Sequence, residues 1–232
     1  MDFTYLDIAK MIDHSLLNPT LTQEDLEAGI QVGLDFDVGS ICIMPYYLKR
    51  CAERLAGSTV YASTTIGFPH GGHTTAIKAA EAERALADGC QELDMVVNIS
   101  KVLSEDWAYV YADIQAVVDL AHAQEQKVKV IFENCYLEDK HKIRLCEICG
   151  EIGADWVKTS TGYGTGGATD ADLKLMRAHS PASVQVKAAG GVRSLDRLLE
   201  VRALGVTRVG ASRTVSMLNE TRQRLGLPPM GG

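Results

Sequence analysis

The 232-residue sequence has no long hydrophobic run, no excess of positive charge and few aromatic residues. No apolar stretch approaches the roughly 18 residues that a membrane-spanning helix needs, so we do not expect a membrane protein. The formal net charge of −7 argues against a general nucleic-acid or anionic-membrane surface, although it leaves room for a small cationic pocket. Residues 1–15 contain early acids and no apolar core flanked by basic residues, which predicts a cytoplasmic protein.

The six cysteines do not form the pattern of a disulfide scaffold or a metal site. Cys146 and Cys149 form a C-x-x-C pair inside a helical pattern in which Leu145, Ile148 and Ile152 share one stripe. No second C-x-x-C or C-x-x-H is available to complete a zinc site. We therefore interpret this pair as core residues of a helix.

Short β-branched runs alternate with amphipathic helical patterns along the whole chain. The predicted strands are 12–17, 38–44, 59–66, 92–97, 127–133, 156–160, 184–188 and 207–210. The predicted helices are 22–34, 46–55, 74–87, 104–123, 137–152, 169–178, 194–203 and 214–225. Because no linker interrupts this alternation, we predict an α/β protein in which residues 1–232 form a single (β/α)8 TIM barrel domain. An open doubly wound sheet is the main alternative.

Several predicted strands carry polar side chains on one face. In a (β/α)8 barrel the outward face of each strand packs on helices and must be apolar, whereas the inward face can become polar near the C-terminal mouth. Strand alternation assigns the inward face to Asp94, Lys129, Glu133, Lys158 and Lys187. The lysines of "DWVKTSTG" and "VQVKAAGG" are therefore predicted to point into a central pocket.

Two or three lysines beside one aspartate suggest chemistry, with a purely structural ion-pair network as the alternative. A second ammonium about 5 Å away, at an effective dielectric constant near 20, costs roughly 3 kcal/mol or about two pKa units. Together with partial desolvation, this brings one lysine toward neutrality near pH 7. A neutral amine attacks carbonyls to form a Schiff base, and the other lysine and Asp94 would then carry protons.

Glycine-rich loops after three predicted strands favour an anion site, with unliganded turn glycines as the alternative. Loops after the seventh and eighth strands form the usual phosphate site of this type of barrel. The expected donors are the backbone N–H groups of Gly162, Tyr163, Gly190, Gly191 and the turn from Gly210 to Arg213. Arg193 and Arg213 are candidate phosphate partners, with a solvated arginine at the start of a helix as the equal alternative for each.

Two further motifs are weaker. Gly162, Gly164 and Gly167 satisfy G-x-G-x-x-G, but the acidic residue that a dinucleotide site needs about 20 positions later is absent. His70 and His73 lie three residues apart in a stretch typical of a loop, and no third ligand is evident. The sequence therefore predicts neither a dinucleotide cofactor nor a metal.

The ordered motifs "IDHSLLNP", "IGFPHG", "ELDMVVNI", "KVIFE", "GADWVKTSTGYG", "VKAAGGVRS" and "RVGAS" span residues 12–212. They resemble the motif set of the deoxyribose-phosphate aldolase family, class I aldolases on a (β/α)8 barrel. The resemblance implies reversible cleavage of 2-deoxy-D-ribose 5-phosphate to D-glyceraldehyde 3-phosphate and acetaldehyde, in cytoplasmic deoxyribonucleoside catabolism and without metal or organic cofactor. It also implies, by analogy alone, a homodimer.

The resemblance assigns individual roles. It makes Lys158 of "VKTSTG" the Schiff-base residue, Lys187 of "VKAAGG" the neighbour that perturbs it and shares in proton transfer, and Asp94 of "ELDMVVN" the proton relay. Strand alternation had selected all three, but it left open which lysine is the nucleophile. The residues expected to bind the substrate or its phosphate are Thr161, Gly162, Gly190, Gly191, Gly210, Ser212, Arg213, Lys129 and Cys42.

Some positions depart from the family pattern. Arg213 in "GASRT" stands where many members have Ser or Gly, "ENCYLED" replaces the more usual Glu-Thr, "CIMP" stands where "CVNP" is common, and the tail "LGLPPMGG" lacks a terminal tyrosine. Two hypotheses therefore accompany the first. One is a Schiff-base aldolase of the same fold acting on another phosphorylated aldol, and the other is a barrel that binds a phosphosugar without turnover.

Overall fold

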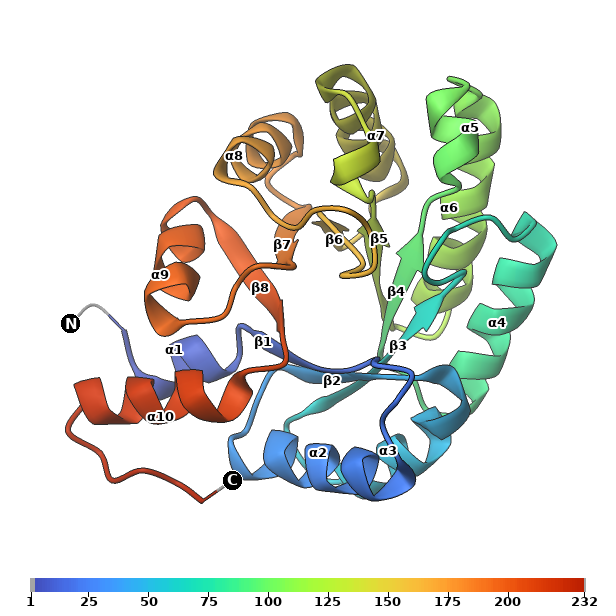
Figure 1. The fold of residues 1–232 in the computed structure, drawn as a ribbon. Helices are drawn as coiled ribbons and strands as arrows, with labels where there is room; N and C mark the ends of the chain where they lie inside the picture. The colour runs from blue at the N-terminus through green and yellow to red at the C-terminus, as the bar shows by residue number, and fades with distance from the viewer. Residues whose placement is uncertain (1–2, 232) are drawn as a thin grey trace.

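The computed structural model describes residues 3–231 and contains a closed barrel of eight parallel strands in chain order (Figure 1). The last strand pairs with the first, so the prediction of a (β/α)8 barrel is confirmed and the open sheet is excluded. The strands are β1 Ile12–Leu16, β2 Ser40–Ile43, β3 Tyr61–Ile66, β4 Glu92–Val96, β5 Lys127–Ile131, β6 Trp156–Lys158, β7 Gln185–Ala189 and β8 Val206–Ala211.

The helices surround the strands as an outer layer (Figure 1). They are α1 Tyr5–Ala9, α2 Gln23–Asp35, α3 Leu48–Leu55, α4 Thr75–Ala87, α5 Ile99–Leu103, α6 Trp107–His122, α7 Asp139–Ile152, α8 Asp170–His179, α9 Leu195–Ala203 and α10 Thr214–Arg224. Within residues 3–231, none of these helices has the length and apolar character needed to cross a membrane.

The structure differs from the predicted elements mainly at their ends. The five-residue helices α1 and α5 were not predicted, since each is too short to show a helical period. Strand β5 ends at Ile131 rather than at 133, because Glu133 adopts a left-handed backbone with φ of 58°. Such a backbone cannot continue an extended strand.

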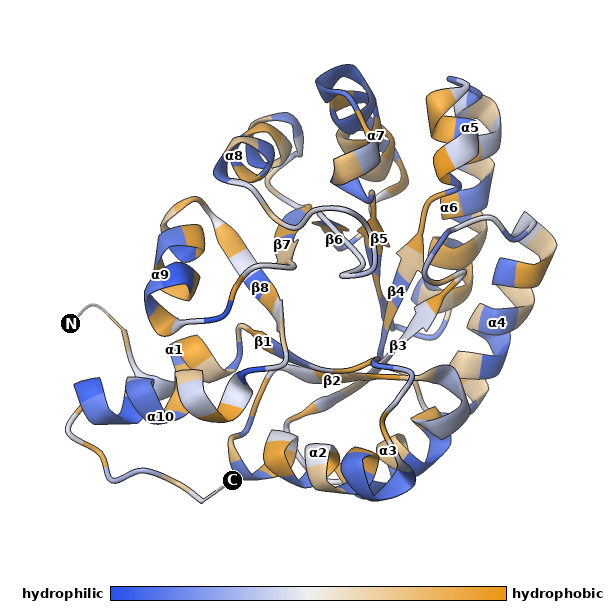
Figure 2. Cartoon of the chain, in the orientation of Figure 1, coloured by the Kyte–Doolittle hydropathy of each residue, from blue (hydrophilic) through white to orange (hydrophobic). Residues whose placement is uncertain are grey.

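The apolar core lies between the outer faces of the strands and the inner faces of the helices, where hydrophobic residues of both layers meet (Figure 2). Leu93 and Met95 of β4 are fully buried on the outward face, as strand alternation predicts. Cys146 and Cys149 are likewise buried in α7, as the helical pattern indicated.

A buried ion pair outside the barrel fixes the end of β4. The Lys78 ammonium of α4 donates to the Val96 carbonyl at 2.8 Å and to Asp113 Oδ2 of α6 at 2.5 Å. The Thr75 hydroxyl donates to the second Asp113 oxygen at 2.8 Å. Both charged side chains are essentially unexposed, so each depends on the other for compensation. Since Val96 follows Asp94 by two residues, this pair helps to place Asp94.

Replacing Lys78 by methionine should lower the free energy of unfolding by about 3–5 kcal/mol, because Asp113 is left buried without a counter-charge. The double variant Lys78→Met/Asp113→Leu should recover most of that loss, since no isolated charge remains. Urea unfolding followed by circular dichroism measures both changes. A single variant as stable as the wild type would show that the pair does not hold α4 and α6 to β4.

Candidate active site

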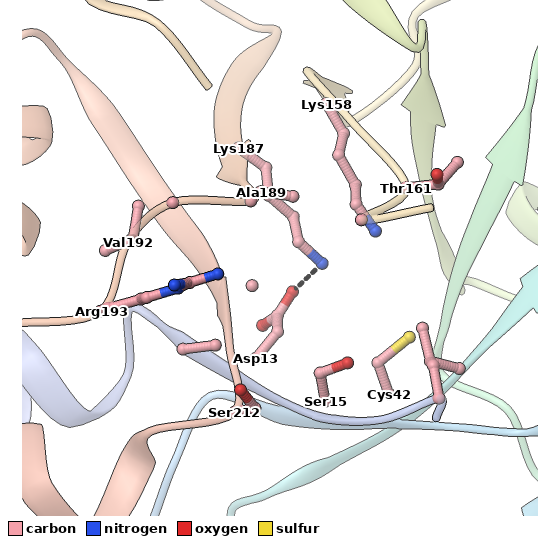
Figure 3. A pocket seen from close by; sticks show the side chains of 16 residues that line it. Asp13, Ser15, Cys42, Lys158, Thr161, Lys187, Ala189, Val192, Arg193 and Ser212 are labelled. Carbon is pink, nitrogen blue, oxygen red and sulfur yellow. Dashed lines mark ion pairs between the residues drawn. The ribbon is translucent and has the colours of Figure 1, made fainter. Parts of the chain in front are cut away.

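A cavity of about 180 Å³ opens at the C-terminal end of the barrel. Asp13 and Ser15 of β1 and Cys42 of β2 line one side, while Lys158 of β6 and Lys187 of β7 reach it from the other (Figure 3). Both lysines therefore point where strand alternation predicts. Val157, the residue before Lys158 on β6, has the opposite strand parity and is fully buried in the apolar layer.

The carboxylate of Asp94 joins three lysines from three strands. Lys158 Nζ lies 2.6 Å and Lys187 Nζ 2.8 Å from Asp94 Oδ2, and Lys129 Nζ lies 3.0 Å from Oδ1. The register of the parallel sheet explains this meeting, because Lys158 and Lys187 are direct neighbours on β6 and β7. Asp94 and Lys129 are direct neighbours on β4 and β5.

Asp13 is a second buried carboxylate of the site, and the sequence interpretation did not single it out. Its Oδ2 lies 2.5 Å from Lys187 Nζ, the ion pair drawn in Figure 3, and 3.3 Å from Lys129 Nζ. Its Oδ1 accepts from the Arg208 guanidinium of β8. The signal was available, because alternation along "IDHSLL" places Asp13, Ser15 and Leu17 on one face, and all three line the cavity.

The two pocket lysines differ in their electrostatic surroundings. Burial, reinforced by the positive charge of Lys187, lowers the pKa of Lys158 against the opposing attraction of Asp94. Burial also acts against the charge of Lys187, but attraction by Asp13 and Asp94 outweighs it and raises the pKa of Lys187. Lys158 is therefore the amine that loses its proton more readily.

The buried cluster as a whole carries an excess of positive charge. Its cations are Lys129, Lys158, Lys187 and Arg208, and its anions are Asp13, Glu92 and Asp94. With four cations and three anions, the cluster is neutral only when one lysine gives up its proton. Lys158 contacts a single carboxylate oxygen, whereas Lys187 contacts two carboxylates and Lys129 three. Lys158 is therefore the least costly to deprotonate.

Lys129 was expected to contact the substrate, but the structure places it one layer below the cavity. Its side chain is unexposed. Its ammonium forms ion pairs with Glu92 at 2.5 Å, with Asp94 at 3.0 Å and with Asp13 at 3.3 Å. Lys129 does not line the cavity. The reason lies in strand register, because Ile131, two residues further along β5, is the neighbour of Lys158.

Glu133 also differs from the expectation that it faces the pocket. Its carboxylate accepts the backbone N–H of Thr161 at 3.2 Å and the Thr161 hydroxyl proton. It therefore fastens the loop after β6, while Thr161 itself lines the cavity as expected. Cys42, also expected at the site, lines the cavity too, and burial together with the Asp94 charge raises the pKa of its thiol.

The glycine-rich loops form one end of the cavity. The predicted residues that line it there are Gly162, Gly190, Gly191, Gly210 and Ser212. Gly190 needs to be glycine, because its φ is 78° and a Cβ atom would lie 2.9 Å from the Cα of Gly167. The backbone N–H of Tyr163 was expected to donate to an anion. In the structure it donates to Thr161 Oγ1 at 3.0 Å instead, so it is not available for that role.

The two candidate phosphate arginines separate in space. Arg193 lines the cavity, and its guanidinium is directed toward it in Figure 3. Arg213 lies at the exposed start of α10 and does not line the cavity. Ser212, the residue before it, takes the place at the rim.

The histidine and cysteine motifs that were weighed as metal ligands lie in separate parts of the fold. His70 and His73 lie exposed in the loop after β3. Across residues 3–231, no three His, Cys, Asp or Glu side chains come together in a way that could hold a metal ion. Burial raises the pKa of the Cys146 thiol to about 11, which keeps it protonated at neutral pH.

Comparisons with known proteins agree with this geometry. Residues 8–215 match the family model described as DeoC/LacD family aldolase. The deoxyribose-phosphate aldolase of Rhodopirellula baltica is 68% identical over 227 residues, which cover 98% of this chain and 94% of that protein. That of Thermococcus gammatolerans is 43% identical, covering 94% of this chain and 97% of that protein.

A solved structure agrees as well. The deoxyribose phosphate aldolase from Aeropyrum pernix, described as tetrameric, matches with a TM-score of 0.85 and 32% identity, covering 96% of this chain and 93% of that one. The match to the family model, over residues 8–215, extends from β1 to β8 and includes every strand that contributes to the buried cluster. The chain therefore belongs to the DeoC/LacD family of aldolases.

Proposed function

We propose that this protein is a class I aldolase that reversibly cleaves 2-deoxy-D-ribose 5-phosphate to D-glyceraldehyde 3-phosphate and acetaldehyde. One observation carries the proposal: Lys158, with a lowered pKa, lies 2.6 Å from Asp94 in a cavity whose other end is lined by glycines and Arg193. The substrate has the matching order of groups, with an aldehyde at one end and a phosphate at the other.

The first step forms the Schiff base. The neutral amine of Lys158 attacks the aldehyde carbon C1, giving a carbinolamine that loses water to become an iminium ion. Water can leave only if its oxygen receives a proton. Lys187, held protonated between Asp13 and Asp94, shares Asp94 Oδ2 with Lys158 and supplies that proton.

The second step breaks the carbon–carbon bond. A base takes the proton of the C3 hydroxyl, the C2–C3 bond breaks, and its electron pair enters the iminium group to give an enamine on Lys158. D-glyceraldehyde 3-phosphate leaves at this point. Protonation of C2 and hydrolysis then release acetaldehyde. We assign the proton movements to Asp94 together with Lys187, because both lie within hydrogen-bond reach of one another beside Lys158.

The phosphate is proposed to bind at the glycine-rich end. Arg193 supplies positive charge there, and the loops carrying Gly162, Gly190, Gly191 and Ser212 supply backbone and hydroxyl donors. This cationic end is local, in agreement with a net charge of −7 for the whole chain. The departure at Arg213 does not alter the cavity lining, so it gives no support to a different phosphorylated substrate.

We further propose that residues 1–232 form one domain, that the protein acts in the cytoplasm without metal or organic cofactor, and that it is a homodimer. An apolar groove between α3 and α4 supports self-association, since Ile77 lines it and is 51% exposed. Exposed Tyr46 lies directly after Pro45 and two residues before Leu48, and both of these residues line the groove. Sedimentation velocity tests the dimer.

Incubating the protein with 2-deoxy-D-ribose 5-phosphate and sodium borohydride should leave an N-ethyl group on Lys158, because reduction traps the Schiff base on the lysine that formed it. Peptide mapping by mass spectrometry locates the adduct. Lys158→Ala should abolish both adduct and cleavage, whereas Lys187→Met should slow adduct formation yet leave it on Lys158. An adduct on Lys187 in the wild type would reverse the assignment, and aldehyde release without any adduct would refute the class I mechanism.

Replacing Arg193 by alanine should raise KM for 2-deoxy-D-ribose 5-phosphate by about 10- to 100-fold, the value of a lost charge-assisted hydrogen bond to phosphate. Cleavage of unphosphorylated 2-deoxy-D-ribose should change little, because that substrate makes no such bond. Arg213→Ala is the matched control and should change kcat/KM by less than about 2-fold. Steady-state kinetics on both substrates measures this. A larger effect of Arg213→Ala than of Arg193→Ala would place the phosphate at α10.

A further inference from the structure

A second layer of charged residues lies beneath Lys158 and Asp94, and no step described above uses it. Arg208 Nη2 donates to Glu92 Oε1 at 2.7 Å, and Nη1 donates to Glu92 Oε2 at 3.1 Å and to Asp13 Oδ1. The Glu92 side chain is 1% exposed and that of Arg208 10%. Neither residue lines the cavity, so neither touches a substrate held there.

Two unbroken chains of ion pairs connect this layer to the nucleophile. From Arg208, contacts run through Asp13 and Lys187 to Asp94 and Lys158, with carboxylate–ammonium distances of 2.5, 2.8 and 2.6 Å after the first contact. From Glu92, the contacts run through Lys129 to Asp94, at 2.5 and 3.0 Å. Both chains reach Asp94, whose carboxylate contacts Lys158.

We propose that Glu92 and Arg208 are positioning residues of the aldolase: through Asp13 and Lys129 they orient Asp94 and Lys187 and set whether Lys158 is neutral. This inference rests on the function proposed above, because it concerns the reactivity of the same lysine. It adds Glu92 and Arg208, which lie beneath the cavity, to the residues that control the reaction. Each acts through other side chains and does not contact the substrate.

The orientation follows from how many partners each carboxylate has. Arg208 occupies Asp13 Oδ1, which leaves Oδ2 of Asp13 directed at Lys187 and Lys129. Lys129, bound by Glu92, occupies Asp94 Oδ1, which leaves Oδ2 of Asp94 to Lys158 and Lys187. Without Glu92 and Arg208, the carboxylates of Asp13 and Asp94 could each turn an oxygen that lacks a cationic partner toward Lys158. Such an oxygen would keep the Lys158 amine protonated.

The charges act in opposite directions. Burial lowers the pKa of Lys158, and the excess of cations over anions in the cluster adds to that effect. Removing the positive charge of Arg208 makes protonation of Lys158 easier, whereas removing the negative charge of Glu92 makes it harder. Along the ion-pair chains, Arg208 lies four contacts from Lys158 and Glu92 lies three. A unit charge about 10 Å away, at an effective dielectric constant of about 20, shifts a pKa by about one unit.

Glu92 and Arg208 belong to a set of polar groups that surrounds Lys158 and Asp94. The ionisable or charged groups in that set are Asp13 from β1, Cys42 from β2, Glu92 from β4, Lys129 from β5, Lys187 from β7 and Arg208 from β8. From β3, the uncharged Ser63 hydroxyl donates to Asp94 Oδ1 at 3.4 Å. Within this set, Glu92 and Arg208 pair with each other, and neither of them lines the cavity.

The test is the pH dependence of kcat/KM for cleavage of 2-deoxy-D-ribose 5-phosphate, with acetaldehyde quantified after quenching. Its acid limb reports deprotonation of the free enzyme's nucleophile, and the ionisation of the substrate is the same for every variant. The variants are Arg208→Gln, Glu92→Gln and the double variant, with Arg208→Lys as a control that keeps the charge. Thermal melting shows which variants are folded.

We expect Arg208→Gln to raise the midpoint of the acid limb by about one pH unit and Glu92→Gln to lower it by about the same amount. The double variant should return near the wild-type midpoint, and Arg208→Lys should leave the midpoint unchanged while lowering kcat through looser geometry. If Arg208→Gln does not fold, the downward shift of Glu92→Gln still decides the question, because each Glu92 partner keeps another carboxylate.

Midpoints that stay unchanged while rates fall at every pH would overturn the inference and leave a purely structural pair. Shifts in the same direction for both single variants would overturn it as well. These results differ from failure of the proposed function, in which the wild type itself neither cleaves the substrate nor forms the borohydride-stable adduct.

Discussion

The carboxylate of Asp94, shared among three lysines, is the interaction on which the rest of the site depends. One buried carboxylate cannot neutralise three ammonium groups. Asp13 and Glu92 supply two more negative charges, but Arg208 adds a fourth positive charge, so one positive charge remains in excess. The remaining excess of positive charge falls on the lysine with the fewest contacts, which is Lys158. The same arrangement raises the pKa of Lys187, so a less basic and a more basic lysine stand side by side, as the proposed roles of nucleophile and acid require.

The barrel provides this arrangement because closure brings the inward faces of distant strands together. Asp94 and Lys187 are 93 residues apart in sequence and 2.8 Å apart in space. The loops after β6, β7 and β8 add the glycines and Arg193 at the other end of the cavity. The substrate proposed above, with an aldehyde at one end and a phosphate at the other, matches these two regions of the cavity.

Much of the fold and part of the site could be predicted from the sequence. Alternation along the strands identified Asp94, Lys158 and Lys187, because direction depends only on local parity. It could not place Lys129, since depth in the barrel depends on the register between neighbouring strands and not on parity. Arg213 illustrates a different limit, because whether a residue two positions past the end of a strand faces the cavity depends on the turn that follows.

The central claim is that Lys158 is the less basic of the two pocket lysines, and its own titration tests this most directly. Protein labelled with ¹⁵N at lysine Nζ can be followed by NMR as a function of pH, with Lys158→Arg and Lys187→Arg variants assigning the two signals. The account predicts a pKa for Lys158 below that of an ordinary lysine and a pKa for Lys187 above it. A Lys158 that titrates at or above the ordinary value, with Lys187 below it, would contradict the account.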